Sequence, residues 1–391
     1  MRAFLDLFWK YRDPDRPPAR MVASYSHQYH PEEILAALGL DSISIALGGI
    51  EEYVPKGTDY LSPTYCVYSR QMLGFFDEYK NNQVDLPGID LMIHSNFCNG
   101  DYHSLEMVNH YFGLDLVPFM VPYKTTERSF RLVMHRIQKF INALCTKFDK
   151  EYFPENLIRV IKESNLLKKK YAELSKSNNV GLEKLEILYE LSLAPWNKRY
   201  GILSSYLDNH STTSKAPRFN LVLTGSPVMV GDKFSRIIGN LDIDIKFFDF
   251  HFGDQQGITR IPVDKDDLPI LGQHVDFSDP IQVLSAYYLE KVAPERMVSG
   301  SNHHLARRLD RIFEYEQYLP GEMEINGIIS HVLKFCDVYG TDRAMLKTLA
   351  QEHHGTPVLD IERDFSSSST GQLATRIEAF HELLMQKSEV A

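Results

Sequence analysis

The chain has 391 residues, more than one hydrophobic core usually supports, so we expect two or three domains. Its hydrophobic fraction of 43% and charged fraction of 24% are those of a globular protein rather than a disordered one. The formal net charge is -10, and no long basic stripe offsets it. Nucleic acid and anionic membrane surfaces are therefore not expected as partners.

The N-terminal apolar patch is interrupted by Asp6 and Lys10 and lacks the core and cleavage site of a signal peptide. The sequence contains no run of about 18 apolar residues, so no membrane span is expected. We therefore expect a cytoplasmic protein. In a reducing compartment its four cysteines are expected to be thiols or metal ligands rather than disulfides.

The first part of the chain alternates short apolar runs with helical patterns. Strands are predicted at 20–26, 43–48 and 89–97, and helices at 31–38 and 65–80. Strands that alternate with helices are typical of a parallel sheet. Residues 1–123 are therefore predicted to form an α/β lobe.

Residues 124–212 differ, because Leu, Lys and Glu recur there at helical spacing with few strand signals. We predict a helical region between two lobes. Residues 213–391 return to the first pattern and are predicted to form a second α/β lobe, with strands at 219–224, 243–250, 325–333 and 357–361 and helices at 283–293, 303–316, 341–354 and 371–387.

A loose duplication relates the two lobes. The run IDLMIHSNFCNGD resembles INGIISHVLKFCDVYGTD, and each is an apolar strand followed by a Phe-Cys pair that contains Cys98 or Cys336. Ligands of open parallel sheets bind outside the carboxyl ends of the strands. A free cysteine is also a common buried apolar residue. The matching positions leave packing and function about equally favoured.

Cys66 is predicted early in a helix that follows Ser62 and Pro63, where helix N–H groups would stabilise a thiolate. A metal ligand and a packed core residue both remain open for it. Cys145 instead extends the apolar face of a helix and is predicted to be a core residue. No two cysteines have the spacing of zinc fingers or ferredoxins. Three ligands from separate loops would leave one metal position open, which suits catalysis.

Several segments, taken in order, resemble the family of 2-hydroxyacyl-CoA dehydratases and benzoyl-CoA reductases. They are HPEEILAALGL, IDLMIHSNFCNGD, RFNLVLTGSPVMVGDKF, INGIISHVLKFCD, GTPVLDIERDF and GQLATRIEAFHELL, and they extend from about residue 20 to 387. The resemblance implies two Rossmann-like (flavodoxin-like) lobes with a helical region. It also implies that Cys66, Cys98 and Cys336 bind one [4Fe–4S] cluster.

The same resemblance implies an ATP-activated radical enzyme acting on a coenzyme A thioester, with dehydration of a 2-hydroxyacyl-CoA through a ketyl radical as the first reading. Its partners would be a related subunit, in a heterodimer or homodimer, and a separate ATP-hydrolysing iron–sulfur activator. The absence of a Walker-type loop from this chain fits an ATPase on another polypeptide. Alternatives are a benzoyl-CoA-type or double-cubane reductase subunit, a non-catalytic electron-relay subunit, and a structural zinc site.

Other polar residues are expected near the carboxyl end of the first strand, namely Ser26, His27, His30 and Glu33. Ser26 and Glu33 are the candidates for positioning or protonating the substrate. The turn Thr224-Gly225-Ser226-Pro227 is either part of a coenzyme A site or a plain β–α turn.

Overall fold

The computed structural model describes residues 1–18, 20–25, 29–210, 217–292, 302–321, 323–341 and 343–390. Its N-terminal part begins with a helix and then alternates strands and helices. These are α1 (Arg2–Lys10), β1 (Met21–Tyr25), α2 (Glu32–Ala37), β2 (Asp41–Ile45), α3 (Tyr53–Gly57), α4 (Val67–Lys80), β3 (Leu91–Ser95), α5 (Asn99–Phe112) and β4 (Leu116–Phe119). The strands form one parallel sheet in the order β2-β1-β3-β4.

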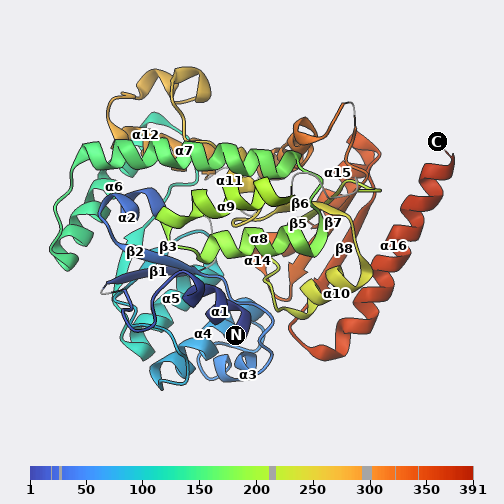
Figure 1. The fold of residues 1–391 in the computed structure, drawn as a ribbon, viewed down its shortest axis with the longest axis horizontal. Coiled ribbons are helices and arrows are strands. Elements are labelled where there is room, and N and C mark those ends of the chain that lie inside the picture. The colour runs from blue at the N-terminus through green and yellow to red at the C-terminus, as the bar shows by residue number, and fades with distance from the viewer. Residues whose placement is uncertain are drawn as a thin grey trace.

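Four long helices follow, as the Leu-, Lys- and Glu-rich pattern predicts: α6 (Glu127–Phe148), α7 (Pro154–Lys176), α8 (Gly181–Leu193) and α9 (Trp196–His210). Thr126 caps α6 by accepting the backbone N–H of Ser129, and a proline opens α7. α7 contacts α2 of the first lobe and the short helix α11 (Gln255–Ile258) of the second, and so bridges the two (Figure 1).

The C-terminal part repeats the alternation, with β5 (Leu221–Gly225), α10 (Lys233–Leu241), β6 (Ile245–Asp249), α12 (Pro280–Ala286), α13 (Asn302–Glu314), β7 (Gly327–Leu333), α14 (Asp337–Gly340), α15 (Arg343–His354), β8 (Val358–Arg363) and α16 (Thr370–Val390). A π-helical turn, η3 (Tyr287–Val292), continues α12. Short 3-10 turns are η1 (Lys265–Asp267), η2 (Gly272–His274), η5 (Tyr315–Tyr318) and η6 (Ser367–Ser369). The sheet order is β6-β5-β7-β8, again parallel.

The two sheets therefore have the same order, which confirms the expected duplication of α/β lobes. In each sheet the first strand lies between the second and the third, so the direction of the chain reverses at one crevice: β1/β3 in the first sheet and β5/β7 in the second. Such a switch point opens a crevice at the carboxyl edge of an open parallel sheet. β3 and β7 are equivalent strands, and each leads into a cysteine.

Buried apolar side chains connect all three predicted segments in one cluster, which includes Phe75, Leu188 and Phe248. The two lobes and the helical region therefore share a continuous core. The division into separate domains at 123/124 and 212/213 stays a prediction.

Several elements were not predicted from the sequence, among them β4 and α1. β4 is only four residues long and contains Pro118, which suits the edge strand that it is. α1 occupies the interrupted apolar patch at the N-terminus and buries Phe4 and Phe8 on one face. The helix predicted at 283–293 is also corrected, because the α-helix ends at Ala286 and gives way to the π-helical turn.

Candidate functional site

The three cysteines implied by the family resemblance occupy the same local position. Cys66, Cys98 and Cys336 are the N-cap residues of α4, α5 and α14, so each sulfur lies beside the backbone N–H groups of a first helical turn, which have no acceptor within their own helix backbone. The sequence placed Cys66 inside its helix, whereas the helix begins at Val67. Cys98 and Cys336 follow β3 and β7 as predicted.

All three cysteines line one cavity of about 80 Å³. The other lining residues come from the ends of the strands that flank both switch points and from the helices that follow. They are Tyr25, Tyr68, Ser69, Phe97, Asp101, Ser226, Pro227, Leu333, Val338 and Tyr339. The topology thus brings segments that lie up to 270 residues apart in the chain, Cys66 and Cys336, to one place (336 − 66 = 270).

Gly100 shows how tightly two of the cysteines are set. A β-carbon at this position would lie 3.6 Å from the Cys98 sulfur, 3.7 Å from the Cys66 β-carbon and 3.1 Å from the Ser69 hydroxyl oxygen. The open side of Gly100 therefore faces both cysteines, and a larger residue would project between them.

Hydrogen bonds reach each sulfur from the helix that it caps. The backbone N–H of Asp101 donates to Cys98 Sγ at 3.2 Å. The backbone N–H groups of Tyr68 and Ser69 donate to Cys66, and those of Val338 and Tyr339 donate to Cys336. Donors of this kind stabilise thiolates and tune the clusters that thiolates bind. The donor set therefore fits a thiolate-ligated iron–sulfur cluster.

Whereas these hydrogen bonds stabilise the thiolate form, burial of the free thiols disfavours it. It raises the pKa of Cys66, raises that of Cys98 well above the ordinary range, and raises that of Cys336 to about 12. The charges of the three sulfurs also act on one another. The charges of Cys66 and Cys336 raise the pKa of Cys98, and the charge of Cys66 raises the pKa of Cys336. Three such thiolates need a positive partner, which bound metal supplies.

Within the described ranges, no group of three His, Cys, Asp or Glu side chains is arranged around a single metal ion. A mononuclear zinc site requires sulfurs that share one ion at about 2.3 Å. A cubane cluster makes a different demand, because each thiolate binds its own iron. The zinc alternative and the cluster are separated by metal analysis.

Cys145 lies apart from this cavity and packs partly buried against a second apolar cluster, as predicted for a core residue. All four cysteines are free thiols in the structure. Cys145 is therefore a natural control for experiments on the other three.

The backbone is strained next to Cys336. Phe335 has a φ of 64°, a value that bulky side chains rarely adopt. Its side chain is 48% exposed, so packing does not explain the conformation. The left-handed region costs an L-residue roughly 1–2 kcal/mol, and asparagine tolerates it best after glycine. Strain of this kind clusters at functional sites.

Phe335→Asn is expected to raise the free energy of unfolding by about 1 kcal/mol, because it relieves the strain and removes little buried apolar surface. Urea denaturation of anaerobically purified protein measures the change. Met345→Asn is the matched control, since Met345 is 46% exposed but lies within α15, where asparagine is expected to cost about 0.5 kcal/mol. A loss of stability in Phe335→Asn would refute the strain.

The structure does not bring Glu33 to the cysteines. Glu33 lies in a second, polar cavity of about 100 Å³, which also contains His30, Lys168, Tyr171 and His251. The hydroxyl of Ser164 donates to the Glu33 carboxyl at 2.8 Å, and burial raises the pKa of that carboxyl. Its catalytic role stays a prediction.

Two other candidates from the sequence, Ser26 and His27, lie outside the described residues. The histidines His353 and His354 are exposed at the end of α15.

Asp101 is a cavity residue that the sequence reasoning missed. It is buried, and the hydroxyl of Ser95 donates to its carboxyl at 2.6 Å. Burial raises the pKa of this carboxyl to about 7, against the opposing effect of the Ser95 hydrogen bond. Its place in the first turn of a helix capped by Cys98 was the available signal.

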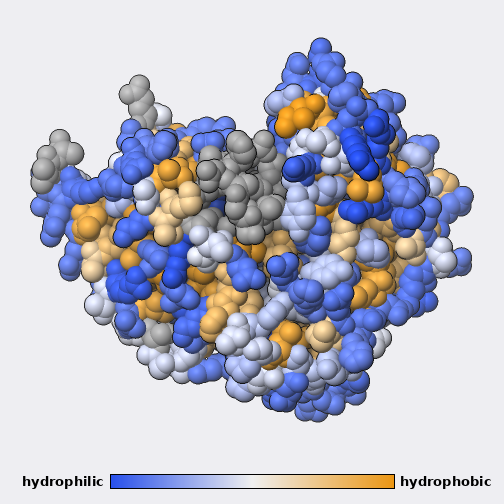
Figure 2. All heavy atoms as spheres, turned by 180° about the vertical axis from the view of Figure 1, so that it is seen from behind, coloured by the Kyte–Doolittle hydropathy of each residue, from blue (hydrophilic) through white to orange (hydrophobic). Residues whose placement is uncertain are grey.

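None of the described helices is both long and apolar enough to cross a membrane. On the face seen in Figure 2, apolar patches are scattered among hydrophilic side chains rather than gathered into a band.

Two parallel-sheet lobes that place three cysteines in one cavity define a class of two-lobed α/β proteins with a thiol-lined site between their switch points. The family model described as 2-hydroxyglutaryl-CoA dehydratase, D-component, matches residues 28–384. The chain belongs to this family.

A relative in Escherichia coli (strain K12), YjiM, whose name describes a dehydratase subunit, is 35% identical over 63 residues. The matched stretch covers 16% of this chain and 16% of that protein. This similarity is local, and it agrees with the family assignment.

Proposed function

We propose that this chain is the [4Fe–4S] subunit of an ATP-activated radical enzyme that acts on a coenzyme A thioester, with dehydration of a 2-hydroxyacyl-CoA through a ketyl radical as its reaction. The observation that carries the proposal is the convergence of Cys66, Cys98 and Cys336 on one cavity at both switch points. Family membership supports the coenzyme A thioester as substrate.

Cys66, Cys98 and Cys336 would hold the cluster. When bound, it would supply a low-potential electron and, because only three thiolates are available, an iron with an open position for a substrate oxygen. The chain's own contribution is the surrounding cavity. Aromatic and aliphatic side chains such as Tyr25 and Leu333 exclude water from it, which protects a reactive intermediate.

The remaining parts of the proposal lie outside this chain. A related subunit would complete the dimer, and a separate ATP-hydrolysing iron–sulfur activator would deliver the electron in the cytoplasm.

Within this chain, Ser26 and Glu33 remain the candidates for positioning or protonating the substrate. The polar cavity that contains Glu33 is where such proton transfer would have to begin.

The test is metal analysis of anaerobically purified protein. About four irons with matching sulfide are expected per chain. Replacing Cys66, Cys98 or Cys336 singly by serine is expected to remove most of the iron, because a harder alcohol oxygen replaces a thiolate. Cys145→Ser, at a cysteine outside the cavity, is expected to keep full iron content. Zinc alone in the wild type, or equal iron in all four variants, would contradict the proposal.

The alternatives are separated by substrate. With the activator, ATP and the related subunit present, turnover of a 2-hydroxyacyl-CoA supports the dehydratase. Reduction of benzoyl-CoA would instead indicate the reductase branch. An iron–sulfur spectrum that responds to neither thioester would indicate an electron-relay subunit.

A further inference from the structure

A chain of buried polar side chains approaches Cys336 from the second sheet, and the proposed function assigns it no role. It begins at Asp232, which is fully buried before α10 and accepts the backbone N–H of Phe234 at 2.9 Å. Arg363, at the end of β8, donates to both oxygens of Asp232, at 3.0 and 2.5 Å. This two-pronged ion pair fixes the guanidinium plane.

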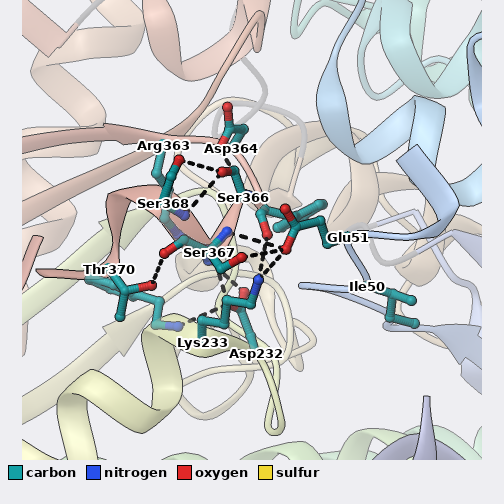
Figure 3. A network of polar contacts seen from close by, with 12 residues as sticks. Ile50, Glu51, Asp232, Lys233, Arg363, Asp364, Ser366, Ser367, Ser368 and Thr370 are labelled. Atoms are coloured by element: carbon teal, nitrogen blue, oxygen red, sulfur yellow. Dashed lines mark hydrogen bonds and ion pairs between the residues drawn. The ribbon is translucent and has the colours of Figure 1, made fainter. Parts of the chain in front are cut away.

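Figure 3 shows Asp232 and Arg363 beside a junction between the lobes, where Glu51 accepts hydrogen bonds from Lys233 and Ser367. The rings of Phe234 and Phe365 cover the Arg363 guanidinium at 5.1 and 5.5 Å. The arginine therefore has little freedom to move.

Arg363 determines the tautomer of His331, a residue of β7 with no exposed surface. The Arg363 Nε–H lies 2.8 Å from His331 Nε2, and an arginine nitrogen can only donate. Nε2 must therefore accept, and the ring hydrogen must lie on Nδ1. His331 Nδ1 is 2.6 Å from the carbonyl oxygen of Ser226, so it donates there.

The backbone of Ser226 is thus held from two sides. His331 Nδ1–H donates to its carbonyl, and its own N–H donates to the His331 carbonyl at 2.8 Å. The preceding Gly225 has a φ of 109°, and a β-carbon there would lie 2.3 Å from the His331 carbonyl oxygen. Only glycine permits this approach.

The hydroxyl of Ser226 then has one orientation. Its oxygen accepts the backbone N–H of Leu333 at 3.1 Å. That contact leaves the hydroxyl hydrogen available to donate. Ser226 and Cys336 line the same cavity, and the Ser226 side chain lies close enough to Cys336 to lower the pKa of its thiol. A hydroxyl that donates to a cluster thiolate stabilises the more negative, reduced form of the cluster.

We infer that Ser226 is a positioning residue that sets the reduction potential of the cluster through its hydrogen bond to Cys336, and that Asp232, Arg363 and His331 hold it in place. This inference rests on the proposed function, because it requires a cluster bound by Cys336. If Ser226 has this role, the β–α turn at 224–227 is part of the redox site rather than a plain connection.

The test is an anaerobic redox titration followed by electron paramagnetic resonance. Ser226→Ala is expected to shift the midpoint potential to more negative values and to change the spectrum of the reduced cluster. Ser226→Thr, which keeps a hydroxyl, is expected to restore both. Ser285→Ala is the control, since this buried hydroxyl donates to the Ile281 carbonyl of its own helix and lies outside the cavity.

Two isosteres of His331 test the relay. His331→Asn keeps a donor near the Nδ1 position for the Ser226 carbonyl, so a potential close to the wild-type value is expected. His331→Gln places its amide near Nε2 and loses that donor, so its potential is expected to shift in the same direction as Ser226→Ala. Spectra of the variants with bound cluster and thermal unfolding curves show that each is folded.

The outcomes separate this inference from the proposed function. A wild-type protein without iron and sulfide would overturn both. A wild-type cluster whose potential is unchanged in Ser226→Ala would overturn the inference alone. Loss of the cluster from Ser226→Ala would also overturn the inference, because Ser226 would then be needed to hold the cluster rather than to set its potential.

Discussion

Lys184→Met is expected to lower the free energy of unfolding by about 3–5 kcal/mol. Lys184 and Asp254 have side chains that are 0% and 1% exposed, and their charged groups lie 2.6 Å apart. The Asp254 carboxylate also accepts the Ser175 hydroxyl at 2.6 Å and the Phe248 backbone N–H at 2.7 Å. Methionine would fill much of the space but leave this carboxylate in the core without its cation.

A neighbouring lysine, Lys246, is the reason why the expected loss of stability in Lys184→Met has a lower end. Burial, assisted by the charge of Lys184, lowers the pKa of Lys246 to about 7, while Asp254 opposes the shift. Loss of Lys184 removes a like charge, so Lys246 gains a proton more easily and compensates Asp254 in part. Lys184→Met combined with Asp254→Asn is expected to be less destabilised than Lys184→Met alone, because no charge is stranded.

Urea denaturation at neutral pH measures the loss. Lys170→Met is the control, because the Lys170–Glu173 pair has side chains 26% and 53% exposed on α7, where solvent screens the attraction and little loss of stability is expected. If Lys184→Met costs no more than Lys170→Met, the helical region is not anchored to the second lobe by this pair.

The apolar pattern of the sequence was sufficient to predict most strands of the two sheets, because these strands are buried on both faces. β1, β3, β5 and β7 are buried along their whole length, which produces the continuous apolar runs that were recognised. β4 was not predicted, because an edge strand needs neither length nor an unbroken apolar run. Strand order was not readable from the pattern, since it depends on contacts between distant segments.

The candidate site was predictable only where the chain repeats itself. Cys98 and Cys336 stood out because equivalent strands lead into both, and the family resemblance added Cys66. The turn that contains Ser226 was recognised from the sequence as a possible coenzyme A site. Nothing local marks His331 or links Ser226 to Cys336, because that link depends on Arg363, which reaches His331 from another strand. Glu33 was placed at the correct edge of its sheet, but periodicity does not tell one cavity at that edge from another.

Acid is expected to destabilise the protein strongly below pH 6.5, because three buried histidines are held neutral. Burial lowers the pKa of His30 to about 4 and that of His251 and His331 to about 3. For His30, the charge of Arg199 also lowers the pKa, while Glu32 raises it. A base with a lowered folded-state pKa contributes stability above its unfolded value, and this stability is lost as the pH falls.

His30→Asn removes one of these contributions directly, and it also removes the His30 charge that helps burial to lower the pKa of His251. His30 is 8% exposed, and its ring lies between the hydroxyls of Ser24 and Ser42, at 2.8 and 3.3 Å. Each pH unit between the unfolded and folded pKa values corresponds to about 1.4 kcal/mol. Between pH 6.5 and pH 4, His30→Asn is therefore expected to lose about 3 kcal/mol less stability than the wild type.

The measurement is a series of urea denaturation curves from about pH 7.5 to about pH 4, compared by their change with pH rather than by their absolute values. Glu33 works in the opposite direction, because its raised pKa lets the folded state take up a proton first as the pH falls. That contribution is common to the wild type and to His30→Asn, so it cancels in the comparison. His353→Asn, at a position solvated in both states, is expected to follow the wild-type curve. Parallel curves for the wild type and His30→Asn would mean that His30 is not held neutral by burial, and the polar cavity would then be open to water.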